Sequence, residues 1–121
     1  SVARYVNEVW NMTNTAYLKQ NDTSPTLDAI LTDASGTVVD VTDATVRFHM
    51  MQIGATTLKI DAAASVIDGA AGHVRYALQN GDTDTPGSYK AEYQVTFPDG
   101  SIETFKNTPD QLRVVITPEL G

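Results

Sequence analysis

Apolar and polar residues alternate one by one over residues 88–97 of the chain. The apolar positions are Tyr89, Ala91, Tyr93, Val95 and Phe97. A period of two puts one set on a buried face and the other in water, which predicts a half-buried β-strand. Residues 45–52 repeat the pattern, with Val46, Phe48 and Met50 on one face and His49 on the other.

The same pattern predicts short strands along the rest of the chain, separated by clusters of turn residues. We expect them at residues 11–19, 26–32, 37–41, 45–52, 73–78, 88–97, 101–106 and 112–117. A hairpin after Gly54 is expected to lead into short segments at 57–60 and 65–68, with at most one helical turn between them. About eight or nine short strands with turns about every 8–12 residues predict an all-β fold, an immunoglobulin-like antiparallel β-sandwich.

Residues 85–89, Thr-Pro-Gly-Ser-Tyr, have the form of a tyrosine corner. In such a corner a Tyr that opens a late strand donates a hydrogen bond to the chain just before it. Ala91 then stands where a sandwich of this type often has a disulfide cysteine. The chain has no cysteine, so the sandwich is held by packing alone.

The first ten residues differ from this pattern. We expect an N-terminal arm over residues 1–10 and a single β-sandwich domain over residues 11–121. The segment carries four large apolar side chains at a spacing that suits a short amphipathic helix or an arm, and such side chains are costly to leave in water. Trp10 either caps the base of the sandwich or belongs to an arm that docks on a neighbouring subunit. The candidate interface residues are Tyr5, Val6, Val9 and Trp10.

Charge and composition exclude several classes of function. The formal net charge is −7, with eleven Asp and four Glu, and many of the Asp residues stand in predicted turns. No basic stripe is present to neutralise phosphates, so we expect no nucleic-acid partner. No apolar run approaches the roughly 20 residues of a membrane-spanning helix, so we expect no membrane partner.

No motif in the chain supports catalysis or a bound cofactor. His49 and His73 are the only histidines, and packing or surface exposure accounts for both better than catalysis does. Their spacing is not that of transition-metal ligands. Within residues 80–87, Asp82 and Asp84 could be positions one and three of an EF-hand calcium loop. Positions five and twelve of that loop would then be Pro86 and Tyr93, which do not supply the ligands that the loop requires. We therefore predict no enzyme, no metal site and no cofactor.

Several segments together resemble a known family. They are residues 17–25, 29–36, 41–50, 72–76, 81–92 and 97–100. Over roughly residues 17–117 the chain resembles the N-terminal immunoglobulin-like domain of the baseplate upper protein family of tailed bacteriophages. Asn21 and Asp43 stand where the family usually has Gly, and both residue types tolerate left-handed backbone angles.

The resemblance implies a non-enzymatic virion structural protein, an adaptor or accessory module at the tail or baseplate. Its expected partners are other virion proteins, namely baseplate, tail or capsid subunits, in a symmetric assembly, and its expected location is the virion. An alternative is a capsid decoration protein on the head. A carbohydrate-binding module is a lesser alternative, because only nine residues are aromatic and several of them are predicted to face the core.

Overall fold

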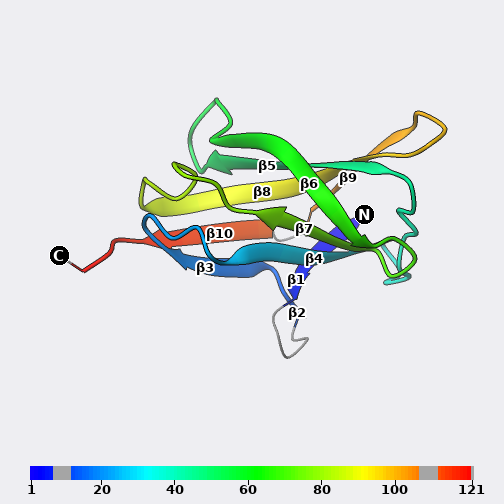
Figure 1. The fold of residues 1–121 in the computed structure, drawn as a ribbon, viewed down its shortest axis with the longest axis horizontal. Coiled ribbons are helices and arrows are strands. Elements are labelled where there is room, and N and C mark those ends of the chain that lie inside the picture. Colours follow the sequence, from blue (N-terminus) through cyan, green and yellow to red (C-terminus); the bar gives the residue numbers. More distant parts are fainter. Residues whose placement is uncertain (7–11, 107–111, 121) are drawn as a thin grey trace.

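The computed structural model describes residues 1–6, 12–106 and 112–120 and consists of β-strands joined by turns (Figure 1). The strands are β1 (Val2–Val6), β2 (Met12–Thr13), β3 (Thr15–Lys19), β4 (Thr26–Thr32), β5 (Thr45–Gln52), β6 (Ile60–Asp68), β7 (His73–Ala77), β8 (Gly87–Thr96), β9 (Ile102–Phe105) and β10 (Leu112–Thr117). No helix in these residues is long and apolar enough to cross a membrane. The prediction of an immunoglobulin-like β-sandwich is confirmed.

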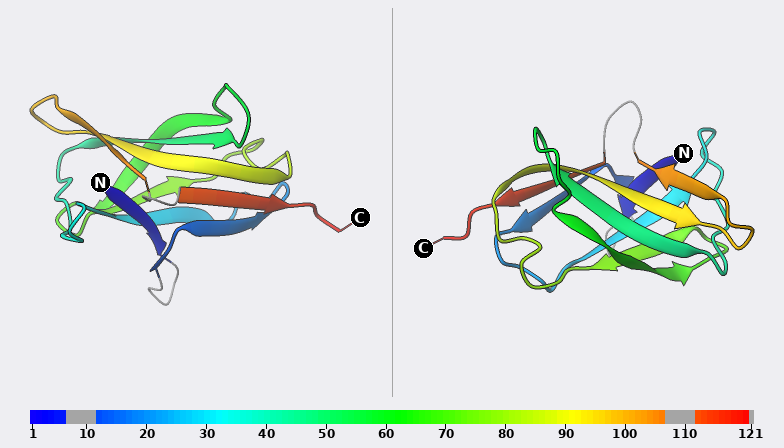
Figure 2. Two further views of the ribbon diagram at one scale, coloured as in Figure 1. Left: turned by 180° about the vertical axis from the view of Figure 1, so that it is seen from behind. Right: turned by 90° about the horizontal axis from the view of Figure 1, so that it is seen from above.

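Two layers face each other, and strand β6 passes from one to the other (Figures 1 and 2). The strand order is β2-β1-β4-β7-β6-β5-β8-β10-β3, with β9 beside β8. The first part of β6 pairs with β5 and its last part with β7, so this strand closes one side of the sandwich. All pairs are antiparallel except β3 with β10, which run parallel. The two ends of the series, β2-β1 and β3, leave the opposite side of the sandwich without a continuous ladder.

The alternating residues of β5 and β8 fill the core as predicted. The Phe48 ring stacks on Tyr76 with centroids 4.7 Å apart and lies 5.1 Å from the ring of Tyr93. The Tyr93 hydroxyl donates a hydrogen bond across the sandwich to the carbonyl oxygen of Leu27. The tyrosine corner is also present, since the hydroxyl of Tyr89 donates to the carbonyl of Thr85 at 2.6 Å.

The N-terminus differs from the prediction. Residues 2–6 form strand β1, which pairs with β4 and β2, so this part of the chain is not a free arm. The chain is held there because Tyr5 is 4% exposed and Ala3 is fully buried, and because the Ala3 N–H donates to the carbonyl of Lys106 at 3.2 Å. The two buried residues, Ala3 and Tyr5, stand two apart, as in a strand with one buried face, whereas the prediction grouped Tyr5 with residues further along the chain. Val9 and Trp10 lie outside the described residues.

Two smaller predictions were wrong and one was correct. Residues 60–68 form the single extended strand β6 and not two separate segments, because residues 60–64 pair with β5. Residues 37–41 form only a bridge from Val38 to Thr32. Asn21 and Asp43 have positive φ angles, 69° and 61°, as expected for residues that replace Gly in turns.

Candidate functional site

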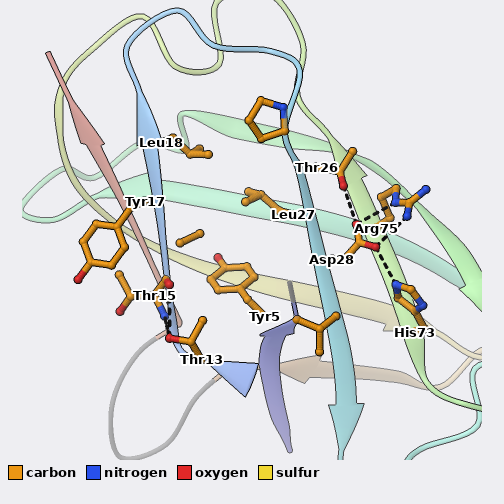
Figure 3. Close-up of a pocket in the computed structure, with 13 residues that line it drawn as sticks. Tyr5, Thr13, Thr15, Tyr17, Leu18, Thr26, Leu27, Asp28, His73 and Arg75 are labelled. Carbon is orange, nitrogen blue, oxygen red and sulfur yellow. Dashed lines mark hydrogen bonds and ion pairs between the residues drawn. The ribbon is translucent and has the colours of Figure 1, made fainter. Parts of the chain in front are cut away.

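A groove of about 790 Å³ opens on the unpaired side of the sandwich, between β3 and the first half of β4 (Figure 3). Residues 26–28 of β4 pair with β7 on one side, while the pairing of β4 with β1 begins only at Ala29. On the facing sheet β3 pairs with β10. Within the described residues no ladder joins β3 to β4, so their edges face each other across the groove. The volume lies within the roughly 300–1,000 Å³ that is usual for binding pockets.

Strand β3 presents free backbone groups to this groove. The Arg113 N–H donates to the Asn14 carbonyl and the Gln20 N–H to the Thr117 carbonyl, both at 2.8 Å. Even-numbered positions therefore point their backbone groups toward β10, and the odd-numbered ones point the other way. The N–H of residue 15 is bonded to the Thr13 hydroxyl, and the carbonyl of residue 19 accepts from Asp22.

The N–H and carbonyl of Tyr17 and the N–H of Lys19 are what this accounting leaves open. Together these three backbone groups form a short open edge of the sheet. A strand from another polypeptide can pair with this edge. The Tyr17 side chain is 75% exposed and does not pack into the core.

The floor of the groove is apolar apart from one hydroxyl. Leu18 and Leu27 approach from the two sheets, and the ring of Tyr5 lies below both of them in the view of Figure 3. The Tyr5 hydroxyl is buried and has no hydrogen-bond partner among the described residues. Burial raises the pKa of this phenol, so the group stays neutral and keeps its proton. A donor without an acceptor, in the floor of a groove, is an unusual feature for a packed core.

One rim of the groove carries a partly buried ionic cluster. Asp28 accepts two hydrogen bonds from Arg75, at 2.8 and 2.9 Å from Nε and Nη2, and lies 2.8 Å from the His73 Nε2. The Thr26 hydroxyl donates to the same carboxylate at 2.8 Å (Figure 3). Burial alone would raise the pKa of Asp28, but these hydrogen bonds outweigh it and lower the pKa. The carboxylate is thus held ionised and its oxygens are occupied.

Three cations lie on the outer face of β3 and of the two strands that follow it in the sheet, β10 and β8. Arg113 on β10 is directly opposite both Thr15 on β3 and Lys90 on β8, and Lys19 is two residues beyond Tyr17 on the same face. No ion pair joins these cations to a carboxylate in the part of the chain that the structure describes. The basic residues Arg47, Lys59 and Arg75, by contrast, are all paired. Their partners are Asp61, Asp84 and Asp28.

The other residues considered from sequence lie elsewhere and have structural partners. His49 is on the outer face of β5, with Nδ1 3.0 Å from the Glu92 carboxylate and Nε2 3.2 Å from that of Asp61. Asp82 accepts hydrogen bonds from the Tyr76 hydroxyl and the Gln79 N–H. No group of three or more potential ligands within residues 1–6, 12–106 and 112–120 is placed to hold a metal ion.

Of the four predicted interface residues, Tyr5 and Val6 line the groove, and Val9 and Trp10 lie outside the described residues. The sequence reasoning predicted a strand over residues 11–19, which contains β3, but it missed the open edge of that strand and the cations beside it. The alternation of Ala16 and Leu18 with Tyr17 and Lys19 indicates a strand with one solvent-exposed face. The neighbouring sequence does not indicate which edge of this strand stays unpaired.

The fold resembles that of a solved β-sandwich protein. The crystal structure of CopC from Methylosinus trichosporium OB3b matches with a TM-score of 0.51 and 10% sequence identity, over 88% of this chain and 87% of that chain. At this identity the likeness establishes the fold. No family model matches the chain. No curated protein matches it either.

These comparisons contradict the prediction of a bacteriophage virion structural protein. The fold resembles that of CopC, and this likeness points away from a virion role at tail, baseplate or head. The turn residues that suggested a phage family are those that many sandwiches need, since Gly, Asn and Asp supply left-handed backbone angles wherever strands reverse. The resemblance to the baseplate family, and the partners and location that it implied, stay predictions that no match tests.

The lesser alternative, a carbohydrate-binding module, has little support from the described side chains. Such modules need exposed aromatic rings, and among the described residues the only aromatic ring exposed by more than a third is that of Tyr17. The rings of Tyr76, Tyr89, Tyr93 and Phe105 are buried.

Proposed function

We propose that this chain is a non-enzymatic protein-binding module, which captures an extended segment of a partner polypeptide by adding it as a strand beside β3. The observation that carries the proposal is the open edge at Tyr17, which borders a groove instead of a neighbouring strand. Strand addition of this kind supplies affinity through main-chain hydrogen bonds and specificity through alternate side chains.

The geometry of an added strand follows from that of β3. A partner strand would lie about 4.8 Å from β3 and bond to the N–H and carbonyl of Tyr17 and to the N–H of Lys19. Every second side chain of the segment would then point into the groove, toward Leu18 and Leu27, and the others would lie beside Tyr17 on the outer face. The groove has room for such inward side chains.

The chemistry of the rim favours binding over catalysis. Asp28 carries a lowered pKa and hydrogen bonds to Arg75 and Thr26, so it is poorly suited to take a proton near neutral pH. The Tyr5 phenol holds its proton for the same reason that makes it a poor acid, namely the raised pKa that burial gives it. These groups can position or seal a bound segment.

Proline scanning of β3 tests the proposal. Tyr17→Pro removes an N–H that points away from β10, and proline is tolerated on an edge strand where its nitrogen faces outward. Leu18→Pro, one residue on, removes an N–H that the alternation assigns to the β10 ladder and should destabilise the fold. Tyr17→Thr is the matched control, because it removes the ring but keeps the N–H.

The probe is a capped peptide, Gly-Ser-Val-Thr-Val-Ser-Gly, followed by its effect on the amide resonances of the labelled protein. We expect shifts and slowed hydrogen exchange at Tyr17 and Lys19, retention of both in Tyr17→Thr, and loss of binding in folded Tyr17→Pro. N-methylation of the peptide amides that face β3 should abolish binding, whereas N-methylation of the amides between them should leave binding intact, because only every second amide faces β3. Equal binding by Tyr17→Pro, or shifts confined to another face, would overturn strand addition.

A further inference from the structure

We infer that the segment added beside β3 is acidic, with carboxylates at two positions four residues apart on its outward face. This inference rests on the proposed strand addition and names the chemistry of the partner. The observation behind it is the set of unpaired cations, Lys19, Lys90 and Arg113, on the outer face of β3, β10 and β8.

The register of the sheet places the cations at both ends of the open edge. Tyr17 stands at the centre, with Thr15 two residues before it and Lys19 two residues after it on the same face. Arg113 is the direct neighbour of Thr15 in the next strand. An added strand would therefore lie beside Lys19 at one end of its outward face. At the other end it would lie beside Thr15, a small residue across which the long side chain of Arg113 can reach.

The charge of Lys90 favours an Arg113 side chain that extends toward the open edge. Like charges directly opposite each other in neighbouring strands are destabilising, and Lys90 and Arg113 form such a pair. An Arg113 side chain that extends away from β8, over Thr15, would lower this repulsion. Carboxylates at the borders of this face have other partners, since Glu92 bonds to His49 and Glu119 to Asn21. An incoming carboxylate is thus the partner that this face lacks.

The composition of the chain makes a basic face notable. The formal net charge is −7, and three of its eight Lys and Arg residues are already paired with carboxylates. A second copy of the chain that paired through its own β3 would bring no carboxylate to Lys19 or Arg113, because residues 15–19 contain no Asp or Glu. A separate acidic segment would meet the local cations, because the wider charge is screened beyond about 8 Å at physiological ionic strength.

Matched peptides test the preference directly. The neutral peptide Gly-Ser-Val-Thr-Val-Ser-Gly is compared with versions that carry Asp, or Lys, in place of both Ser residues, by titration at low and physiological salt. The Asp peptide can form two exposed ion pairs, one at each end of the edge, and should bind about two- to thirtyfold more tightly than the neutral one. The Lys peptide should bind most weakly, and added salt should narrow these differences.

Two variants locate the effect. Lys19→Gln and Arg113→Gln should each lower the affinity for the Asp peptide about two- to fivefold more than they lower the affinity for the neutral peptide. Lys106→Gln is the control for loss of one positive charge elsewhere, because Lys106 follows β9 and its backbone bonds to residues 1 and 3 at the start of the chain. It should leave the preference intact.

The outcomes separate the two proposals. If the neutral and acidic peptides bind equally, and Tyr17→Pro abolishes both, strand addition stands and the acidic preference is wrong. If the Asp peptide binds equally well to Tyr17→Pro, its carboxylates act without strand addition and the proposed function is wrong. Absence of binding by any of the peptides would overturn both, and concentration-dependent dimers through β3 would show a second copy as the occupant.

Discussion

The buried hydroxyl of Tyr5 leads to a prediction whose sign is unusual: Tyr5→Phe should stabilise the protein. Most core substitutions destabilise, and removal of a buried hydrogen-bonded hydroxyl usually costs stability. Tyr5 differs because its hydroxyl is buried with no acceptor among the described residues. The folded state therefore carries the cost of taking this hydroxyl out of water, which the substitution removes.

The size of the change in the free energy of unfolding follows from the cost of burying an unpaired polar group. An unsatisfied buried donor costs about 1–3 kcal/mol, and a slight loss of packing around the ring offsets part of it, so we expect a gain of about 1 kcal/mol. Tyr89→Phe is the matched control. It removes the same atom from a hydroxyl that does have an acceptor, the Thr85 carbonyl at 2.6 Å, and should cost about 1 kcal/mol or more.

Urea unfolding followed by fluorescence or circular dichroism measures both changes. With a slope of about 2 kcal/mol per M, the two midpoints should move in opposite directions by roughly 0.5 M each. A loss of stability in Tyr5→Phe as large as that in Tyr89→Phe would refute the reasoning, because it would show that the Tyr5 hydroxyl is bonded in the folded protein.

The remaining predictions concern the ionic rim and one turn. The pKa of Asp28 is lower in the folded state than its ordinary value near 4, so its contribution to stability is full above about pH 4 and is lost as the pH falls through the folded pKa. Asp28→Asn should accordingly lower the urea midpoint at pH 7 and change it little near pH 2, and an equal loss at both would contradict the cluster's role. Gly72→Ala should cost about 2 kcal/mol, because the φ of Gly72 is +65° and an added Cβ would lie 2.8 Å from the Leu31 carbonyl oxygen. Gly36→Ala, at φ +91° with open space around it, should cost about 1 kcal/mol in the same unfolding assay, and equal costs would show that the close approach at Gly72 is unimportant.

The architecture was accessible from sequence because the strands obey local rules. Strict alternation and flanking turn residues predicted the bounds of β4, β5 and β10 as the structure has them. The tyrosine corner was found for the same reason: Tyr89 bonds only four residues back. These features depend on neighbours in the chain, which a sequence displays.

The groove was not accessible, because it depends on which strands fail to pair. Tyr17 is exposed at an open edge only because β3 pairs with β10, about 100 residues away, and because β1 meets β4 no earlier than Ala29. The cations beside it are likewise brought together by register, since Lys19, Lys90 and Arg113 are distant in the chain. Tyr5 shows the converse error. Its apolar neighbours suggested an arm, whereas residues 2–6 pair with β4 as a strand, which places Tyr5 in the core.

The central claim is that β3 accepts a strand, and the amide of Tyr17 reports on it most directly. Hydrogen exchange at this amide should be fast in the free protein and slow by about tenfold or more when the Asp peptide is bound, while the amide of Leu18, assigned to the β10 ladder, stays protected in both states. An amide of Tyr17 that exchanges at the same rate with and without bound peptide would contradict the account.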